Sequence, residues 1–193
     1  MESRTNIRYD ISLQAVLPDA PFSECHTRIV DATAAGVWQA LLTLSWTDLR
    51  VSLPLILART GGRAKWERRP VLDHGPVDEI ASDPPRCWVG GRIGKPWQPR
   101  PEFVEGPLSL DEFVAFDEPG WLKYGMDFHL DALSDGRTVV TTATRCTPTD
   151  DAAHRRFGHY WRVIRPFSGL VRRDMLRALA VAAEDAGGLS RCA

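Results

Sequence analysis

Two groups of residues in this sequence have the types and spacing needed to move a proton. In the first, His129 lies two positions from both Asp127 and Asp131. A carboxylate beside an imidazole orients the ring and stabilises its charged form. Because side chains alternate between the two faces of a strand, these three would share one face, opposite the apolar one. We therefore expect the His129 group on the outer surface of a sheet, away from any enclosed ligand.

The second group is centred on His154, which shares a helical face with Phe157 and Trp161. From this face the imidazole could look into the mouth of a pocket. The alternative is a hydrogen-bonded histidine in a core or at its rim, which is the commoner role of a lone histidine on such a face. The catalytic residues stay unassigned. His154 is the weak candidate, and His26 is a further histidine that could act in catalysis.

The sequence contains no motif for a metal, a nucleotide or a catalytic triad. HExxH, phosphate-loop and Ser/His/Asp patterns are absent, and the glycine-rich run 90–94 lacks the following helix that a dinucleotide site needs. The four cysteines form no CxxC pair, which argues against zinc and against a redox dithiol. We expect no metal ion and no cofactor. The cysteines are Cys25, Cys87, Cys146 and Cys192.

Composition narrows the class of protein. The 193 residues carry 24 basic and 25 acidic side chains, a formal net charge of −1, whereas nucleic-acid-binding proteins usually have a basic excess. The length suits a single domain. The N-terminus has no apolar signal-peptide core, and no stretch approaches ~18 apolar residues. We predict a cytoplasmic protein, a monomer or a homodimer, that does not bind nucleic acid.

The longest predicted element is a helix over 149–185. Its apolar side chains recur at spacings of three and four, which places them on one face. Thr149 or Asp150 is a suitable N-terminal cap, and Pro166 predicts a bend. The other side of this helix carries seven arginines: Arg155, Arg156, Arg162, Arg165, Arg172, Arg173 and Arg177.

The remaining pattern predicts an α+β fold. We expect an arm or edge strand over 1–22, one domain over 23–185 and a flexible tail over 186–193. One face of a curved antiparallel sheet must be covered, and only the last helix is long enough to cover it. The predicted strands are 23–31, 77–82, 86–94, 108–117, 121–131 and 137–147, and two short helices are predicted at 32–44, capped by Thr33, and at 52–59.

Several short segments resemble a known family. The strand-to-helix segment 28–41, the late hairpin and the helix opening at 156–161 are similar to the SRPBCC superfamily of START-like helix-grip domains, which includes lipid carriers and polyketide cyclases. Segments 91–97 and 144–146 are most similar to small bacterial members of unknown function. The resemblance implies a helix-grip fold, with a largely apolar cavity between the curved sheet and the long helix.

The resemblance also implies which residues bind a ligand. In the superfamily such cavities hold sterols, lipids, polyketides or other hydrophobic molecules. The alternative is that the same side chains fill a core and leave no room for a ligand. The candidate lining is Tyr124, Met126 and Phe128 from the sheet, Trp161, Ile164 and Ser168 from the helix, and Trp97 at the rim.

Three functions remain open. The first, which we favour, is the binding or carriage of a small hydrophobic molecule. The second is an enzyme of the cyclase or dehydratase kind, which needs a polar pair in the cavity, such as His154 with Tyr124. The third is a peripheral membrane or partner-binding module that uses the arginine-rich helix. The alternative to the third function is that the arginines form an ordinary solvent-exposed face of the helix, on which their stems cover apolar surface.

Overall fold

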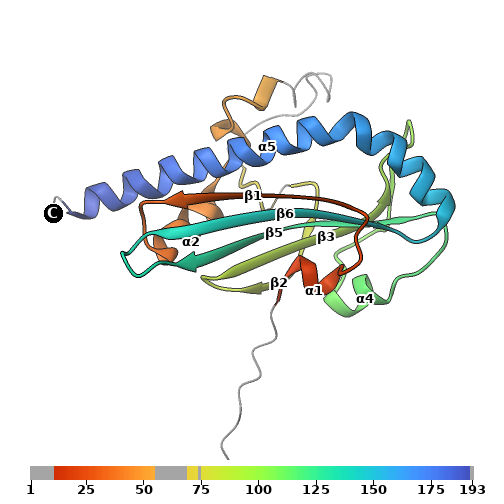
Figure 1. Cartoon of the computed structure of the whole chain (residues 1–193), viewed down its shortest axis with the longest axis horizontal. Coiled ribbons are helices and arrows are strands. Elements are labelled where there is room, and N and C mark those ends of the chain that lie inside the picture. The colour runs from red at the N-terminus through yellow and green to blue at the C-terminus, as the bar shows by residue number, and fades with distance from the viewer. Residues whose placement is uncertain (1–10, 55–68, 74, 192–193) are drawn as a thin grey trace, which may run out of the picture.

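The computed structural model describes residues 11–54, 69–73 and 75–191, with side chains as far as residue 187. Within these ranges a sheet lies between one long helix and two short ones (Figure 1). The predicted helix over 52–59 lies mostly outside the described residues. The elements are α1 (Leu13–Val16), β1 (Phe22–Val30), α2 (Ala34–Thr43), the 3-10 turn η1 (Trp46–Asp48), β2 (Asp78–Asp83), β3 (Cys87–Lys95), β4 (Glu102–Phe103), α4 (Leu110–Ala115), β5 (Leu122–Ala132), β6 (Thr138–Pro148) and α5 (Asp151–Arg191).

The described strands form one antiparallel sheet in the order β1-β6-β5-β3-β2, with β4 added to β3. The hairpin of β5 and β6 at its centre turns at Gly136, whose φ of 85° suits glycine. This architecture confirms the predicted fold class, a curved antiparallel sheet with a long C-terminal helix. The predicted strands 23–31, 77–82, 86–94, 121–131 and 137–147 agree closely with β1, β2, β3, β5 and β6.

Helix α5 runs along one face of the sheet and bends over its end (Figure 1). Asp150 provides the N-terminal cap, because its Oδ1 accepts a hydrogen bond from the amide of Ala153 at 2.6 Å. Thr149 instead bonds with its hydroxyl to the backbone of Trp121. Pro166 lies inside the helix, where it removes one backbone hydrogen bond. None of the helices in the described ranges is both long and apolar enough to cross a lipid bilayer.

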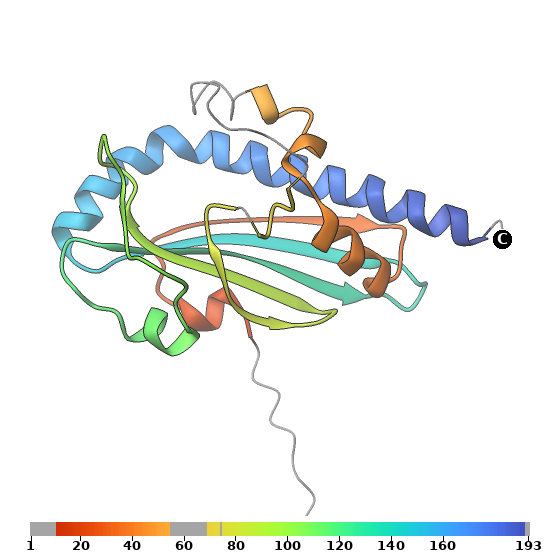
Figure 2. The same ribbon diagram turned by 180° about the vertical axis from the view of Figure 1, so that it is seen from behind.

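Two apolar clusters lie on opposite sides of the sheet. Between the sheet and α5, a cluster with α2 includes Val37, Trp88, Phe128 and Leu179. Thr33 caps α2, as predicted. On the other side, α1 and α4 pack their side chains against β3, and Figure 2 shows both of these helices across the sheet from α5. We call the side toward α5 the inner face and the side toward α1 and α4 the outer face.

The prediction of a strand over 108–117 is wrong. This segment contains α4, and its first turn carries a capping box, in which Ser109 and Glu112 satisfy each other's backbone amides. The apolar residues Leu110, Phe113 and Val114 suit a helix by their spacing as well as a strand, and the local cap favours the helix. For the N-terminal region, the described part is not an edge strand but an ordered arm that contains α1.

Candidate functional site

The register of the sheet places polar and apolar side chains together on the inner face. Glu24 lies opposite Thr144 on β6, and Thr144 lies opposite Met126 on β5. In the next row, His26 lies opposite Thr142, and Thr142 lies opposite Phe128. Because every second residue of a strand points to the same side, both rows face α5. Four polar side chains therefore lie beneath the long helix.

Arg172 is the helix residue that meets this polar surface. Its side chain is buried, with 8% of the residue exposed, and Nε donates to Thr144 Oγ1 at 3.1 Å. Nη1 contacts the sulfur atoms of Met126 and Met175, which are weak acceptors. Burial lowers the pKa of the guanidinium, and the nearby charge of Glu24 partly offsets this effect. The prediction that Arg172 belongs to the outer, solvated side of the helix is wrong.

Ser168 completes the inner polar cluster, which we define as Glu24, His26, Thr142, Thr144, Ser168 and Arg172. Ser168 donates a hydrogen bond to Glu24 Oε1, which ties α5 to β1. His26 Nε2 lies 3.9 Å from Glu24 Oε2, within ion-pair distance but beyond hydrogen-bond distance.

Part of this cluster lacks a hydrogen-bond partner. Thr142 Oγ1 and His26 Nε2 are both buried, and neither is hydrogen-bonded by a described residue. Among the contacts of Arg172 with described residues, Nε and Nη1 are engaged and Nη2 has no acceptor. Buried polar groups in native proteins almost always have partners, either protein atoms, water or a ligand. Thr142 Oγ1 and His26 Nε2 therefore keep hydrogen-bonding capacity that no described residue uses.

The predicted ligand-lining residues occupy different environments. Met126 and Phe128 are buried in the main core, and the Tyr124 hydroxyl donates to the Pro76 carbonyl at 3.4 Å. Burial raises the pKa of Tyr124 well above its ordinary value, with Arg92 acting in the opposite direction. Ser168 belongs to the inner polar cluster. A ligand-binding role for these four residues stays a prediction.

The other predicted lining residues belong to an aromatic cluster at the N-terminal end of α5. Trp161 and Trp97 lie with their rings 5.7 Å and 6.2 Å from the ring of Phe157, and Ile164 packs beside them. Contacts of this kind stabilise a core. At this end of the inner face, the described contacts favour the core-filling alternative, and ligand binding by Trp97, Trp161 and Ile164 remains a prediction.

His154 lies at the edge of the same cluster. The residue is exposed, and its ring packs 5.0 Å from the ring of Phe22. The structure does not bring it together with Tyr124 as a buried polar pair. His26, the other histidine considered from the sequence, is the one on the inner face.

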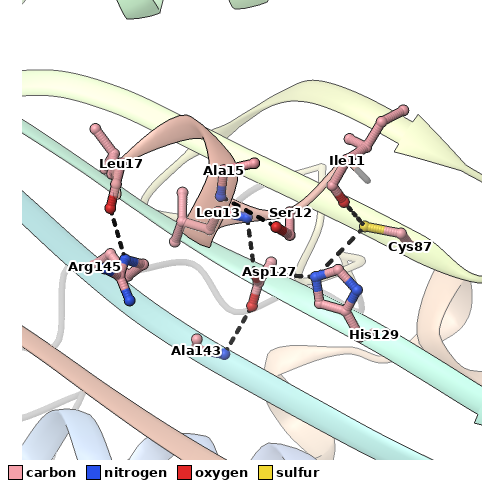
Figure 3. Close-up of polar contacts among 10 residues, drawn as sticks. All are labelled: Ile11, Ser12, Leu13, Ala15, Leu17, Cys87, Asp127, His129, Ala143 and Arg145. Atoms are coloured by element: carbon pink, nitrogen blue, oxygen red, sulfur yellow. Dashed lines mark hydrogen bonds and ion pairs between the residues drawn. The ribbon is translucent and has the colours of Figure 1, made fainter. Parts of the chain in front are cut away.

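On the outer face, Asp127 organises a second group of polar contacts (Figure 3). Its Oδ2 accepts hydrogen bonds from the Leu13 amide at 3.1 Å and from His129 Nε2 at 3.2 Å, and its Oδ1 accepts from the Ala143 amide at 2.8 Å. Cys87 Sγ lies 3.8 Å from the same Nε2. The expectation of an open outer surface is wrong here, because α1 covers Asp127, which is only 3% exposed.

Cys87, His129 and Asp127 do not form a catalytic triad. In a triad the two ring nitrogens serve different partners, whereas here both partners approach Nε2. Hydrogen bonds to Asp127 and Cys87 raise the pKa of His129 to about 10, so at neutral pH the imidazole is charged and cannot act as a base. The Cys87 thiol donates to the Ile11 carbonyl at 2.7 Å.

The outer group instead holds the N-terminal arm on the sheet. Asp127 binds the start of α1, and Arg145 binds its end by donating to the carbonyls of Leu17 and Pro18 at 2.8 Å and 2.7 Å. Figure 3 shows the contacts of Asp127 with Leu13 and of Arg145 with Leu17, which reach the arm from the strands beneath it. To these polar contacts the arm contributes backbone groups, while its Leu13 and Leu17 side chains are buried in the apolar cluster of the outer face.

Comparisons with known proteins give similarity of fold alone. No family model and no curated protein matches this sequence. Among solved structures, a conserved protein from Geobacillus kaustophilus is similar at 12% identity and a TM-score of 0.42, covering 86% of this chain and 97% of that one. The Zhui aromatase/cyclase from Streptomyces sp. R1128 is similar at 14% identity and a TM-score of 0.31, covering 84% and 93%. At these values the similarities assign no activity or ligand to this chain.

Proposed function

We propose that the protein binds a small, mostly apolar molecule between the sheet and α5, and that the inner polar cluster contacts an oxygen atom of that molecule. The observation that carries the proposal is a pair of buried polar atoms that no described residue hydrogen-bonds, Thr142 Oγ1 and His26 Nε2, beside the buried side chain of Arg172. Apolar side chains such as Phe128 surround them.

The combination of groups favours a ligand of mixed character. Apolar walls supply most of the binding free energy of a small molecule, and a few polar groups fix its orientation. Arg172 is suited to the second role, because a charged guanidinium donates strong, directional hydrogen bonds to oxygen acceptors. Glu24 moderates the charge of the cluster. A neutral carbonyl or hydroxyl, or a single carboxylate, fits these groups.

Fluorescent probes test the proposal. cis-Parinaric acid is an apolar chain with an oxygen-bearing end, and N-phenyl-1-naphthylamine is apolar without such an oxygen. We expect both probes to bind saturably at one site per chain. Arg172→Met should weaken parinaric acid binding by ~10-fold, the effect of one lost hydrogen bond from a charged donor, and leave naphthylamine binding within about twofold.

Arg173→Met is the matched control, because Arg173 is the next residue of the same helix and is exposed. It should leave both affinities unchanged. Failure of both probes to saturate at one site would indicate a filled core and would refute the proposal. Native mass spectrometry of the purified protein, followed by denaturing extraction, provides the independent readout, since a bound apolar molecule would appear at a stoichiometry of one.

A second candidate function is proton transfer on the bound molecule, as in a cyclase or dehydratase. The observation that favours it is the pair Glu24 and His26, a carboxylate and an imidazole 3.9 Å apart on the inner face. Such a pair can act as base and orienting group. Glu24→Gln should then change the chemical identity of the extracted molecule, whereas a carrier would yield the same molecule from both proteins.

A further inference from the structure

The N-terminal half of α5 carries a concentrated positive charge. Residues 152–173 contain six arginines and two histidines but no aspartate or glutamate. Arg172 is turned into the molecule, and the other five are exposed. The rest of the chain must compensate, because the whole protein has a net charge of −1. The charge of this region is therefore a local feature that attracts an anionic surface. The five exposed residues are Arg155, Arg156, Arg162, Arg165 and Arg173.

Exposed apolar side chains lie among these arginines. Val163 is 66% exposed and Phe167 is 50% exposed. They are four residues apart on a helix, so their side chains are neighbours on its surface. Single exposed apolar residues are ordinary. An adjacent pair bordered by arginines is instead typical of a helix that lies in a membrane interface.

The helical positions separate three of the five exposed arginines from the apolar pair. At ~100° per residue, Arg155, Arg162 and Arg173 follow one side of the solvent-facing surface, and Val163 and Phe167 follow the other. An arginine stem lets its charge reach a headgroup while apolar neighbours enter the acyl boundary. We define the α5 docking face as Arg155, Arg162, Val163, Phe167 and Arg173.

We propose that the α5 docking face binds the surface of a membrane that contains anionic lipid. The charge of the face complements the negative headgroups, and the apolar pair supplies the contact that a solvated arginine face lacks. The inference is independent of the inner polar cluster, because the helix residues of that cluster, Ser168 and Arg172, face the sheet, whereas the α5 docking face is exposed to solvent. Pro166, also exposed, lies between the two apolar residues in the sequence and has no amide hydrogen to satisfy.

Vesicle flotation tests the inference with the full chain. We expect the protein to float with vesicles of phosphatidylcholine containing ~30% phosphatidylglycerol at ~50 mM salt, and to be released at ~500 mM salt, where charges are screened within a few ångström. It should not float with pure phosphatidylcholine. Arg162→Gln should weaken binding by about fivefold. The double change Val163→Ser with Phe167→Ser should weaken it by ~10-fold or more.

Two control variants separate this face from general surface effects. Val181→Ser removes another exposed apolar residue of α5, and Arg137→Gln removes an exposed arginine in the turn between β5 and β6. Neither should change flotation by more than about twofold. Absence of binding to anionic vesicles at low salt would overturn the inference, and so would equal losses in the control variants. If the α5 docking face instead bound an acidic protein, the protein would not bind anionic vesicles at low salt.

Discussion

The charged state of His129 should contribute to the stability of the fold in a pH-dependent way. Hydrogen bonds to Asp127 and Cys87 raise its pKa in the folded protein from 6.5 to about 10. In the unfolded chain the pKa returns to its ordinary value. Below pH ~6.5 both states hold the proton and the full stabilisation is present. As the pH rises through the folded pKa, the proton leaves and the stabilisation is lost.

The magnitude follows from the size of the shift. At ~1.36 kcal/mol per pH unit, the shift sets an upper limit of ~5 kcal/mol. The His129 side chain is 26% exposed, and solvent screens its interaction with Asp127, so we expect ~2 kcal/mol. The change His129→Gln should therefore lower the free energy of unfolding by ~2 kcal/mol at pH 6.5, and this difference should shrink toward zero near pH 10.

Urea unfolding at pH 6.5, 8 and 9.5 measures this difference, with both proteins in the same buffers. His159→Gln is the control, because His159 is exposed and, among the described residues, bonds only to a backbone carbonyl of its own helix. A stability difference for His129→Gln that stays constant from pH 6.5 to 9.5 would refute the reasoning and would indicate packing alone.

Two further predictions concern stability measured by urea or thermal unfolding. Asp174 is buried, and although burial acts to raise its pKa, hydrogen bonds from two backbone amides, a serine hydroxyl and an arginine lower it overall. Asp174→Asn should therefore cost ~2–3 kcal/mol, whereas the exposed Asp185→Asn should cost almost nothing; equal losses would contradict the assigned contacts. Gly125→Ala would place Cβ 2.5 Å from the carbonyl oxygen of Gly90 and should cost ~2 kcal/mol or more, because backbone must move. Gly36→Ala, with its nearest neighbour at 3.4 Å in a helix, should be neutral or stabilising by up to ~1 kcal/mol; the same loss at both sites would rule out the steric explanation.

The elements of the fold were largely readable from local patterns. Alternation over 121–131 and the glycine turn at Gly136 correctly predict the central hairpin, and the caps Thr33 and Asp150 begin their helices as expected. The segment 108–117 was misread because its apolar spacing suits both a strand and a helix. The Ser109 and Glu112 capping box is the signal in the sequence that favours the helix.

The candidate site was less readable, because its members come from three distant segments. Arg172 lies four residues after Ser168 and three before Met175, which is the spacing of the buried stripe, so its inward direction was present in the pattern. Its charge suggested the opposite assignment. A guanidinium is usually solvated, and only the position of Thr144 on the neighbouring strand shows why this one is not.

Local sequence determined which segments are strands and helices, which side of each is apolar, and that a long helix must cover the sheet. These properties depend on residues within a few positions of one another. Tertiary structure alone decided that Glu24, Thr142 and Arg172 meet on the inner face, and that Asp127 holds the N-terminal arm. The partners of Asp127 are mainly backbone amides, and a backbone amide has no signature in the sequence. Its location is known only when the chain has folded.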